Sequence, residues 1–150
     1  MSDAVNITVE QVRETSPELM EALARLVPQL SSSWRGITSD EVEAIVTDPH
    51  CALFLARTVE ATIIGTLTLV AFSIPTGHRA WIEDVVVDES ARGLGAAKAL
   101  VSAALDEARA RSITTVDLTS RPSRVAANQL YLSMGFESRE TNVYRFSLDS

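Results

Sequence analysis

The residues with the clearest chemical potential form a short glycine-containing loop, Arg92-Gly93-Leu94-Gly95. A β-branched run at 81–87 and an acidic turn precede the loop, and a run of helix formers follows it. The loop is therefore predicted to open directly into a helix. The first turn of a helix leaves backbone N–H groups unpaired and carries the positive end of the helix dipole. Because glycine leaves the approach open and Arg92 adds a cation, this loop is suited to binding phosphate.

The spacing of the loop separates it from two common phosphate-binding sites. It lacks the full G-x-G-x-x-G fingerprint of dinucleotide sites and the Lys-Ser/Thr pair that follows the glycines of a P-loop. It matches R-x-x-G-x-A through Arg92, Gly95 and Ala97, and V-V-V-D precedes it. This pattern resembles motif A of the GNAT superfamily of acyl-CoA-dependent N-acyltransferases. For the two glycines alone, a tight strand-to-helix turn without a ligand is the alternative.

A second segment, from Arg124 to Phe136, resembles motif B of the same family, N-x-x-A-x-x-L-Y-x-x-x-G-F. Arg124 stands where that motif commonly begins with Asn, and Asn128 lies one turn later. We expect Asn128 to contact the cofactor chain, with Arg124 as an alternative contact to a phosphate. The resemblance implies that the hydroxyl of Tyr131 lies near the cofactor sulfur and acts as the general acid. A buried tyrosine that bonds to the backbone is the alternative.

An unperturbed amine is mostly protonated at neutral pH, so acyl transfer from a thioester also needs a base, or a water chain to one, unless binding lowers the pKa of the amine. Glu83 is the candidate, since burial among its apolar strand neighbours would make its carboxylate a stronger base. The alternation of the strand places it on the face of Trp81, Val85 and Val87. Its position relative to Arg92 matches the carboxylate base of histone-type family members. Asp84 is the fallback base, and an ion pair with Arg79 or another cation is the structural alternative for Glu83.

The resemblance further implies how the cosubstrate, acetyl-CoA, is held. In the GNAT fold a bulge in the fourth strand separates it from the fifth and opens an edge, to which the pantetheine amides pair as a peptide would. The expected cofactor-binding residues are Val85, Val86, Val87, Arg92, Gly93, Leu94, Gly95, Ala96 and Ala97, with the pyrophosphate at the glycine loop. Trp34 and Arg35 lie between the first two expected helices. They either border the acceptor and influence substrate choice or simply cover the edge of the core.

The rest of the chain predicts a mixed α/β fold, the GNAT acyl-CoA N-acyltransferase fold, in a single domain over residues 1–150. Strands are expected at 6–13, 52–57, 62–72, 81–87, 113–119, 136–140 and 142–148, and helices at 17–30, 39–46, from 96 and from 123. Ser16 with Pro17, and Thr38 with Glu41, are helix start signals. The family resemblance implies a central mixed sheet of about six to seven strands flanked by four helices.

Composition argues against several other classes of function. The formal net charge of the 150 residues is −7, which disfavours nonspecific binding to nucleic acid. Cys51 is the single cysteine and is accompanied by two histidines, so neither an internal disulfide nor a metal site is expected. No apolar run approaches the roughly 20 residues that cross a bilayer, and the N-terminal sequence lacks a secretory pattern. A cytoplasmic protein without a membrane partner is expected.

The sequence thus predicts an enzyme, an acetyl-CoA-dependent N-acetyltransferase that acylates a primary amine. No residue is an evident acyl-enzyme nucleophile, so direct attack within a ternary complex is expected. The main alternative is a noncatalytic acyl-CoA-binding or regulatory module. The presence of Glu83 and Tyr131 favours the enzyme, because a pure binder needs neither residue. A nucleotide-binding domain is a third hypothesis. The acceptor, a small molecule or a peptide amine, stays open, as does the acyl group. The resemblance also allows a homodimer, since dimers are frequent among relatives.

Overall fold

The computed structural model describes residues 6–149, and the chain divides after Leu118 into two compact units. We call them the sheet unit, up to Leu118, and the C-terminal unit, from Thr119. The sheet unit contains β1 (Thr8–Val12), α1 (Pro17–Leu30), α2 (Ser39–Thr47), β2 (Cys51–Arg57), β3 (Ile63–Ile74), β4 (Gly77–Val87), the 3₁₀ turn η1 (Glu89–Ala91), α3 (Ala96–Ala110) and β5 (Thr115–Asp117). The C-terminal unit contains α4 (Val125–Ser133).

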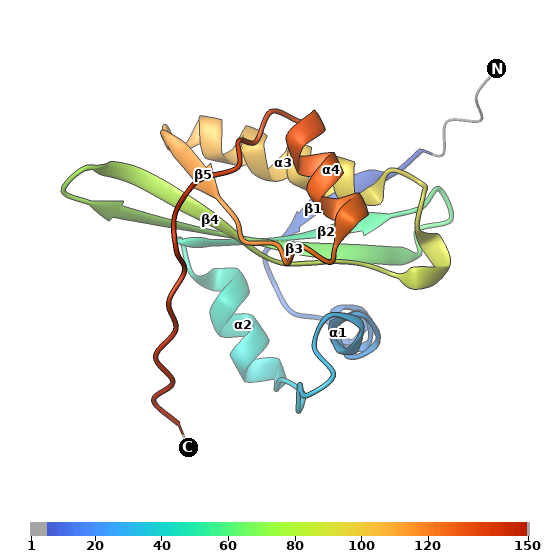
Figure 1. Cartoon of the computed structure of the whole chain (residues 1–150). Helices are drawn as coiled ribbons and strands as arrows, with labels where there is room; N and C mark the ends of the chain where they lie inside the picture. Colours follow the sequence, from blue (N-terminus) through green and yellow to red (C-terminus); the bar gives the residue numbers. More distant parts are fainter. Residues whose placement is uncertain (1–5, 150) are drawn as a thin grey trace. The chain divides into compact units, whose positions relative to one another are not determined.

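A mixed sheet in the order β1-β2-β3-β4-β5 forms the centre of the sheet unit. The strands β1 to β4 are antiparallel neighbours, and β5 runs parallel to β4. Helices α1 and α2 cover one face of the sheet and α3 covers the other (Figure 1). On the first face, a buried apolar cluster joins the two helices to the sheet through Leu19, Leu23, Leu26, Val42, Val46, Leu53, Leu55, Ile63 and Val86. The predicted mixed α/β class and the four α-helices are confirmed.

The helices begin where the sequence signals place them. The hydroxyl of Ser16 accepts a hydrogen bond from the backbone N–H of Leu19 at 3.1 Å, and Pro17 occupies the first helical position of α1. Thr38 and Glu41 form the predicted capping box at the start of α2. These local contacts satisfy helix-end donors that would otherwise be unpaired, so the boundaries could be predicted without tertiary information.

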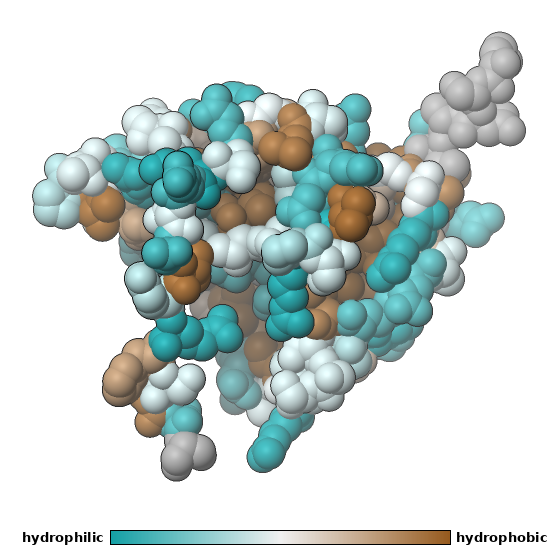
Figure 2. Space-filling view, in the orientation of Figure 1, coloured by the Kyte–Doolittle hydropathy of each residue, from teal (hydrophilic) through white to brown (hydrophobic). Residues whose placement is uncertain are grey.

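The predicted strands at 136–140 and 142–148 are wrong, because the described part of this segment contains neither strand nor helix. Apolar side chains do alternate with polar ones there, which would give an extended segment one apolar face. A strand also needs a neighbouring strand to hydrogen-bond with its backbone, and alternation does not supply one. Figure 2 shows hydrophobic atoms along the segment at the lower left. The described sheet therefore has five strands rather than six to seven. The fifth is also shorter than predicted, since β5 covers Thr115–Asp117 instead of 113–119.

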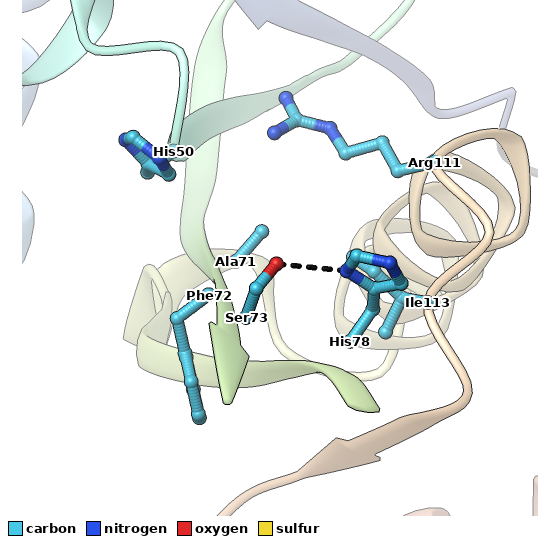
Figure 3. A pocket seen from close by; sticks show the side chains of 7 residues that line it. All are labelled: His50, Ala71, Phe72, Ser73, His78, Arg111 and Ile113. Carbon is cyan, nitrogen blue, oxygen red and sulfur yellow. Dashed lines mark hydrogen bonds between the residues drawn. The ribbon is translucent and has the colours of Figure 1, made fainter. Parts of the chain in front are cut away.

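The long β3–β4 hairpin carries a surface hollow of about 150 Å³ near its turn (Figure 3). His50, Ser73, His78 and Arg111 point their polar groups around it, and the Ser73 hydroxyl lies 2.8 Å from Nδ1 of His78. The hollow thus lies at the hairpin end of β4, and the glycine loop follows the opposite end of the same strand.

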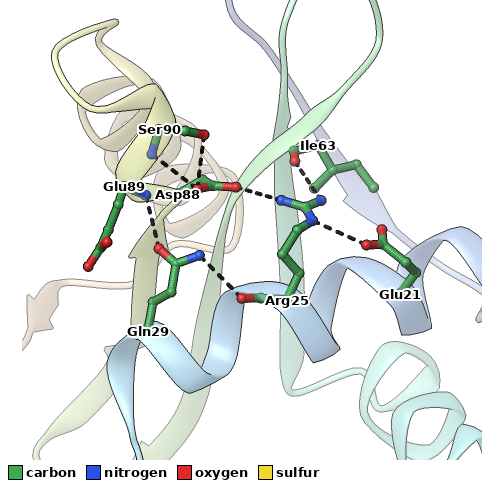
Figure 4. Close-up of polar contacts among 7 residues, drawn as sticks. All are labelled: Glu21, Arg25, Gln29, Ile63, Asp88, Glu89 and Ser90. Atoms are coloured by element: carbon green, nitrogen blue, oxygen red, sulfur yellow. Dashed lines mark hydrogen bonds and ion pairs between the residues drawn. The ribbon is translucent and has the colours of Figure 1, made fainter.

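At that opposite end, polar contacts fix the turn after β4 to α1 (Figure 4). Arg25 donates one hydrogen bond to the Asp88 carboxylate at 2.7 Å and another to the carbonyl of Ile63 at 3.0 Å. The side-chain oxygen of Gln29 accepts a hydrogen bond from the backbone N–H of Glu89 at 2.9 Å. Helix α1 therefore holds the turn that leads into the glycine loop.

The ionised form of Asp88 is favoured at this position. The backbone N–H of Ser90 donates to its carboxylate at 3.1 Å, and this bond, followed by the Ser90 hydroxyl and Arg25, holds the pKa of Asp88 below its usual value against the opposing effect of burial. A depressed pKa in the folded state means that Asp88 stabilises the fold above its unfolded-state pKa, and that this contribution is lost as the pH falls through its folded-state pKa.

We predict that Asp88→Asn lowers the free energy of unfolding by about 1 kcal/mol near pH 7, because the amide cannot replace the charge-assisted bonds from Arg25 and Ser90. The difference from wild type should be smaller near pH 3 than near pH 7, because the contribution declines as the pH falls toward the lowered folded-state pKa of Asp88; urea unfolding at both pH values measures it. Asp106→Asn is the matched control: its ion pair with Arg109 is 72–78% exposed, so little change is expected. A loss of stability of equal size at both pH values would contradict the assigned role of the Asp88 charge.

Candidate functional site

The glycine loop takes a backbone conformation that other residues rarely adopt. Gly93 has φ of +83° and Gly95, the residue before α3, has φ of +87°. A Cβ built at either glycine would meet no atom within 4 Å, so glycine is needed here for its backbone angles rather than for lack of internal space. The same empty space leaves the start of α3 open to an approaching ligand.

The first turn of α3 offers unpaired donors. No side chain caps this helix and no acidic residue lies in its first turn. The carbonyl of Gly95 accepts the helical hydrogen bond of Ala99 at 3.0 Å, so the N–H groups of Ala96, Ala97 and Lys98 precede the helical hydrogen-bond ladder. These donors and the helix dipole together favour an anion at this point.

Two cations flank these donors. Arg92 is 65% exposed, and its nearest acidic partner, Glu89, lies 4.0 Å away. Lys98 is exposed in the first turn of α3. A cation there is repelled by the positive end of the helix dipole, and a bound anion would offset this repulsion. Lys98 was not among the predicted site residues. Its position three residues after Gly95, in an otherwise uncapped first turn, is the signal that could have identified it.

Strand β4 contains a bulge next to this loop. Between the partners of Glu83 and Val86, two residues of β4 lie opposite one residue of β3, and Asp84 has φ of +51°. Strand β5 pairs with β4 only from Arg79 to Trp81. Beyond that point the β5 side of β4 has no strand partner in the sheet unit, so its backbone groups are available to an amide-bearing ligand.

The bulge also changes the face on which Glu83 lies. Glu83 and Val86 pair with Thr68 and Thr66, which are two residues apart on β3 and therefore share a face. Val86 packs into the cluster beneath α1 and α2, so Glu83 faces the same side and Val87 the other. The predicted grouping of Glu83 with Val87 was wrong, because the extra residue interrupts the two-residue period of the strand.

Glu83 is exposed, so the predicted burial among apolar neighbours is also wrong. The alternative ion pair of Glu83 with Arg79 is not formed either, and Arg79 instead donates a hydrogen bond to the hydroxyl of Thr76 at 3.1 Å. The loop that connects α1 and α2 belongs to the same side of the sheet as Glu83, and in it Trp34 is half-buried while Arg35 is exposed. The sheet unit therefore places Glu83 and the two predicted acceptor residues on one side of the sheet.

In the C-terminal unit, Tyr131 is 7% exposed, and its ring packs edge-on against Phe136 with centroids 5.7 Å apart. Burial raises the pKa of Tyr131, and the nearby charge of Arg124 opposes this only in part. The side-chain amide of Asn128 donates to the carbonyls of Arg121 and Arg124 at 2.9 and 2.8 Å. Both donations hold the turn before α4, so only the Asn128 side-chain oxygen is left to contact a cofactor.

The hollow at the β3–β4 hairpin contains none of the predicted site residues. Within residues 6–149, no group of three or more His, Cys, Asp or Glu side chains is placed to hold a metal ion. No helix in that range is both long enough and apolar enough to cross a membrane.

Comparison with solved structures shows which folds this chain is similar to. An aminoglycoside acetyltransferase from an uncultured soil metagenomic sample superimposes with a TM-score of 0.83 at 19% identity, over 96% of this chain and 97% of that one. A putative acetyltransferase from Agrobacterium tumefaciens gives 0.78 at 24% identity, over 93% and 99%. Glucosamine-6-phosphate N-acetyltransferase from Arabidopsis thaliana gives 0.78 at 18% identity, over 96% and 99%. These similarities establish the shared fold.

Comparison with proteins of curated function gives no significant match. The model of the acetyltransferase (GNAT) family, in contrast, matches residues 18–136, which include the bulged strand, the glycine loop and the segment through Phe136. The chain therefore belongs to the acetyltransferase (GNAT) family, a family of enzymes.

Proposed function

We propose that this protein transfers the acetyl group of acetyl-CoA to a primary amine by direct attack within a ternary complex. The observation that carries the proposal is the open start of α3, where unpaired N–H groups and two cations follow a bulged strand with a free edge. The family match crosses the boundary at Leu118, which supports the two compact units acting as one catalytic domain.

The proposed cofactor site uses backbone more than side chains. The pyrophosphate would accept hydrogen bonds from the N–H groups of residues 93–98, with Arg92 and Lys98 neutralising its charge. The two pantetheine amides would pair with the free edge of β4 at 85–87. The side-chain oxygen of Asn128 is a further acceptor for an amide of the cofactor chain. Backbone recognition of this kind explains why four of the five residues 93–97 are glycine or alanine and why none of them is chemically reactive.

Glu83 is proposed as the general base. The acceptor reaches the site mostly as an ammonium, and it must lose a proton before its nitrogen can attack the thioester carbonyl. An exposed carboxylate on the side of Trp34 and Arg35 can take that proton when the acceptor covers it. Asp84, which the bulge also leaves exposed, is the alternative base. As the new C–N bond forms, the C–S bond breaks and releases the coenzyme A thiolate.

Tyr131 is proposed as the general acid for that thiolate. Because its pKa is raised, the phenol stays protonated across the neutral range and retains a proton to donate. The sulfur takes this proton or a hydrogen bond as it departs. The nitrogen, now bonded to the acetyl carbon, loses its second proton to solvent, and the phenolate recovers a proton from solvent. The edge-on packing against Phe136 limits the positions that the ring can take.

The acceptor is proposed to be a small-molecule amine. Two structural neighbours are named for acetylation of aminoglycosides and of glucosamine 6-phosphate, both of which are amines of small size. A cationic acceptor also suits a chain with a net charge of −7 and two exposed carboxylates, Glu83 and Asp84, at the bulge. A peptide N-terminus is the competing acceptor, for which a ribosomal-protein-alanine N-acetyltransferase neighbour is the precedent.

The proposal is tested by measuring thiol release from acetyl-CoA with a panel of aminoglycosides, amino sugars, amino acids and peptides. Turnover that depends on one class of amine, together with calorimetric binding of coenzyme A, is the expected result. Binding without turnover on any amine would favour the noncatalytic module, and tighter binding of ATP or NAD than of coenzyme A would favour a nucleotide-binding domain.

We predict that Glu83→Gln lowers kcat by about two to three orders of magnitude with the best acceptor, because the amide cannot accept the proton. The affinity for acetyl-CoA should stay within about twofold of wild type, since Glu83 lies on the side of the sheet opposite α3. Glu60→Gln, which alters an exposed carboxylate in the β2–β3 turn, is the control and should leave both quantities unchanged. A wild-type rate for Glu83→Gln with a large loss for Asp84→Asn would transfer the role to Asp84.

For the second catalytic group, Tyr131→Phe should lower kcat by about ten- to a hundredfold while the ring contact with Phe136 and the thermal stability are retained. The rate lost should be recovered in part with an acyl donor whose thiol is a better leaving group, because such a thiolate needs less protonation. Tyr144→Phe removes the hydroxyl of the other tyrosine, which is 87% exposed, and should have no effect on the rate. Equal losses for good and poor leaving groups would argue that the Tyr131 hydroxyl has a structural role.

A further inference from the structure

The turn 88–91, which joins β4 to the glycine loop, is held by hydrogen bonds at each of its four backbone N–H groups. Three of these groups donate to oxygen atoms of the turn itself or of the neighbouring strand β3. The fourth, that of Glu89, donates to the side-chain oxygen of Gln29 in α1 at 2.9 Å (Figure 4). Among the described residues 6–149, by contrast, no oxygen atom accepts from the N–H groups of residues 92–98. A fixed turn therefore leads into a loop whose donors are free for a ligand.

Gln29 and Arg25 contact this turn from one face of α1. They lie four residues apart, so their side chains project from consecutive turns of the helix. The amide group of Gln29 also donates to the backbone carbonyl of Arg25 at 3.2 Å, which directs its oxygen toward Glu89. The guanidinium of Arg25 donates to the Asp88 carboxylate at 2.7 Å. Because two consecutive residues of the turn are bonded to one helix, the turn cannot rotate about a single contact.

Asp88 carries a negative charge close to the loop where an anion would bind. Its side chain is partly buried, and its ionised form is favoured. Because the 3₁₀ turn rises about 2 Å per residue, the Cα atoms of Asp88 and Gly93 are at most about 13 Å apart. The Debye length is about 10 Å in 0.1 M salt and partly buried charges are screened less, so this carboxylate would repel a phosphate bound at the loop. The guanidinium of Arg25 compensates the charge of Asp88 and leaves Arg92 for the ligand.

We propose that Gln29 and Arg25 are positioning residues for the phosphate end of coenzyme A. Gln29 holds the turn so that the N–H groups of the glycine loop face the pyrophosphate, and Arg25 cancels the repulsion from Asp88. The inference rests on the proposed function, because it concerns the same cofactor site. Neither side chain touches the cofactor in this arrangement, since both act through residues 88 and 89. The pantetheine end of the cofactor, along the β4 edge, should not depend on them.

The first test compares the binding of coenzyme A and of pantetheine, which lacks the pyrophosphate, by calorimetry on Gln29→Met. Methionine is similar to glutamine in length and volume but has no oxygen to accept the hydrogen bond of Glu89. The affinity for coenzyme A should fall about five- to tenfold, as expected for the loss of one hydrogen bond, while that for pantetheine stays within about twofold of wild type. With the best acceptor, KM for acetyl-CoA should rise and kcat should be retained, because the reacting groups are not altered.

Gln11→Met is the matched control for this test. Gln11 lies in β1 and its side chain accepts a hydrogen bond from Arg13 at 3.3 Å, so the substitution should leave both affinities unchanged. Thermal unfolding checks that both variants are folded. If folded Gln29→Met keeps the wild-type preference for coenzyme A, or loses affinity equally for both ligands, the inference is overturned while the phosphate site stands. A wild-type chain with no preference for coenzyme A over pantetheine overturns the proposed phosphate site as well.

The second test separates the charge of Asp88 from the shape of the turn. Arg25→Met should lower the affinity for coenzyme A about tenfold or more, because the Asp88 charge is then uncompensated. Adding Asp88→Asn should restore a large part of this affinity, since the asparagine oxygen can still accept from the N–H of Ser90 but carries no charge. Pantetheine should bind alike to wild type and to both variants. If the double variant binds coenzyme A as weakly as Arg25→Met, or more weakly, the role proposed for Arg25 is wrong.

Discussion

The unpaired backbone N–H groups at the start of α3 are the constraint on which the site depends. Such donors have to be satisfied, and here neither a capping side chain nor an acidic residue does so. Gly95 takes a left-handed φ that directs the chain into the helix without placing a side chain over them. Arg92 and Lys98 add positive charge where the helix dipole is already positive, which is favourable only with an anion present. The bond from Arg25 to Asp88 holds this whole turn against α1.

In the proposed site, the β4 bulge separates the side that would meet the acceptor from the edge that would hold the cofactor. By adding one residue, it directs Glu83 toward the side of the sheet covered by α1 and α2, while the edge that continues to the glycine loop stays free of β5. The proposed cofactor therefore lies along an edge, and the proposed acceptor approaches from a face. Under this proposal, a change of acceptor would require changes in the α1–α2 loop, with Trp34 and Arg35, and none in the cofactor site.

The features that local chemistry determines could be predicted from the sequence. The caps at Ser16 and Thr38, the glycine turn and the motif spacing depend on residues close together in the chain, and the structure agrees with them. The side on which Glu83 lies could not be predicted, because one residue of positive φ at Asp84 shifts the strand period. The alternation after Phe136 led to two predicted strands that the structure does not contain, because alternation of side chains alone does not supply the backbone partner that a strand needs. Catalytic roles for Glu83 and Tyr131 stay predictions that rest on residue type and motif position.

The central claim, that the start of α3 binds the pyrophosphate, is tested most directly by calorimetric comparison of coenzyme A with pantetheine, which has the amides and thiol but no pyrophosphate. Wild type should bind coenzyme A at least about a hundredfold more tightly, because several charge-assisted hydrogen bonds are lost with the phosphates. In Gly95→Trp, whose side chain would cover the helix end, the preference should nearly vanish. Gly36→Trp, at a glycine of similar φ with equally empty surroundings, should retain it. Equal affinities for the two ligands in wild type, or an undiminished preference in Gly95→Trp, would contradict the account.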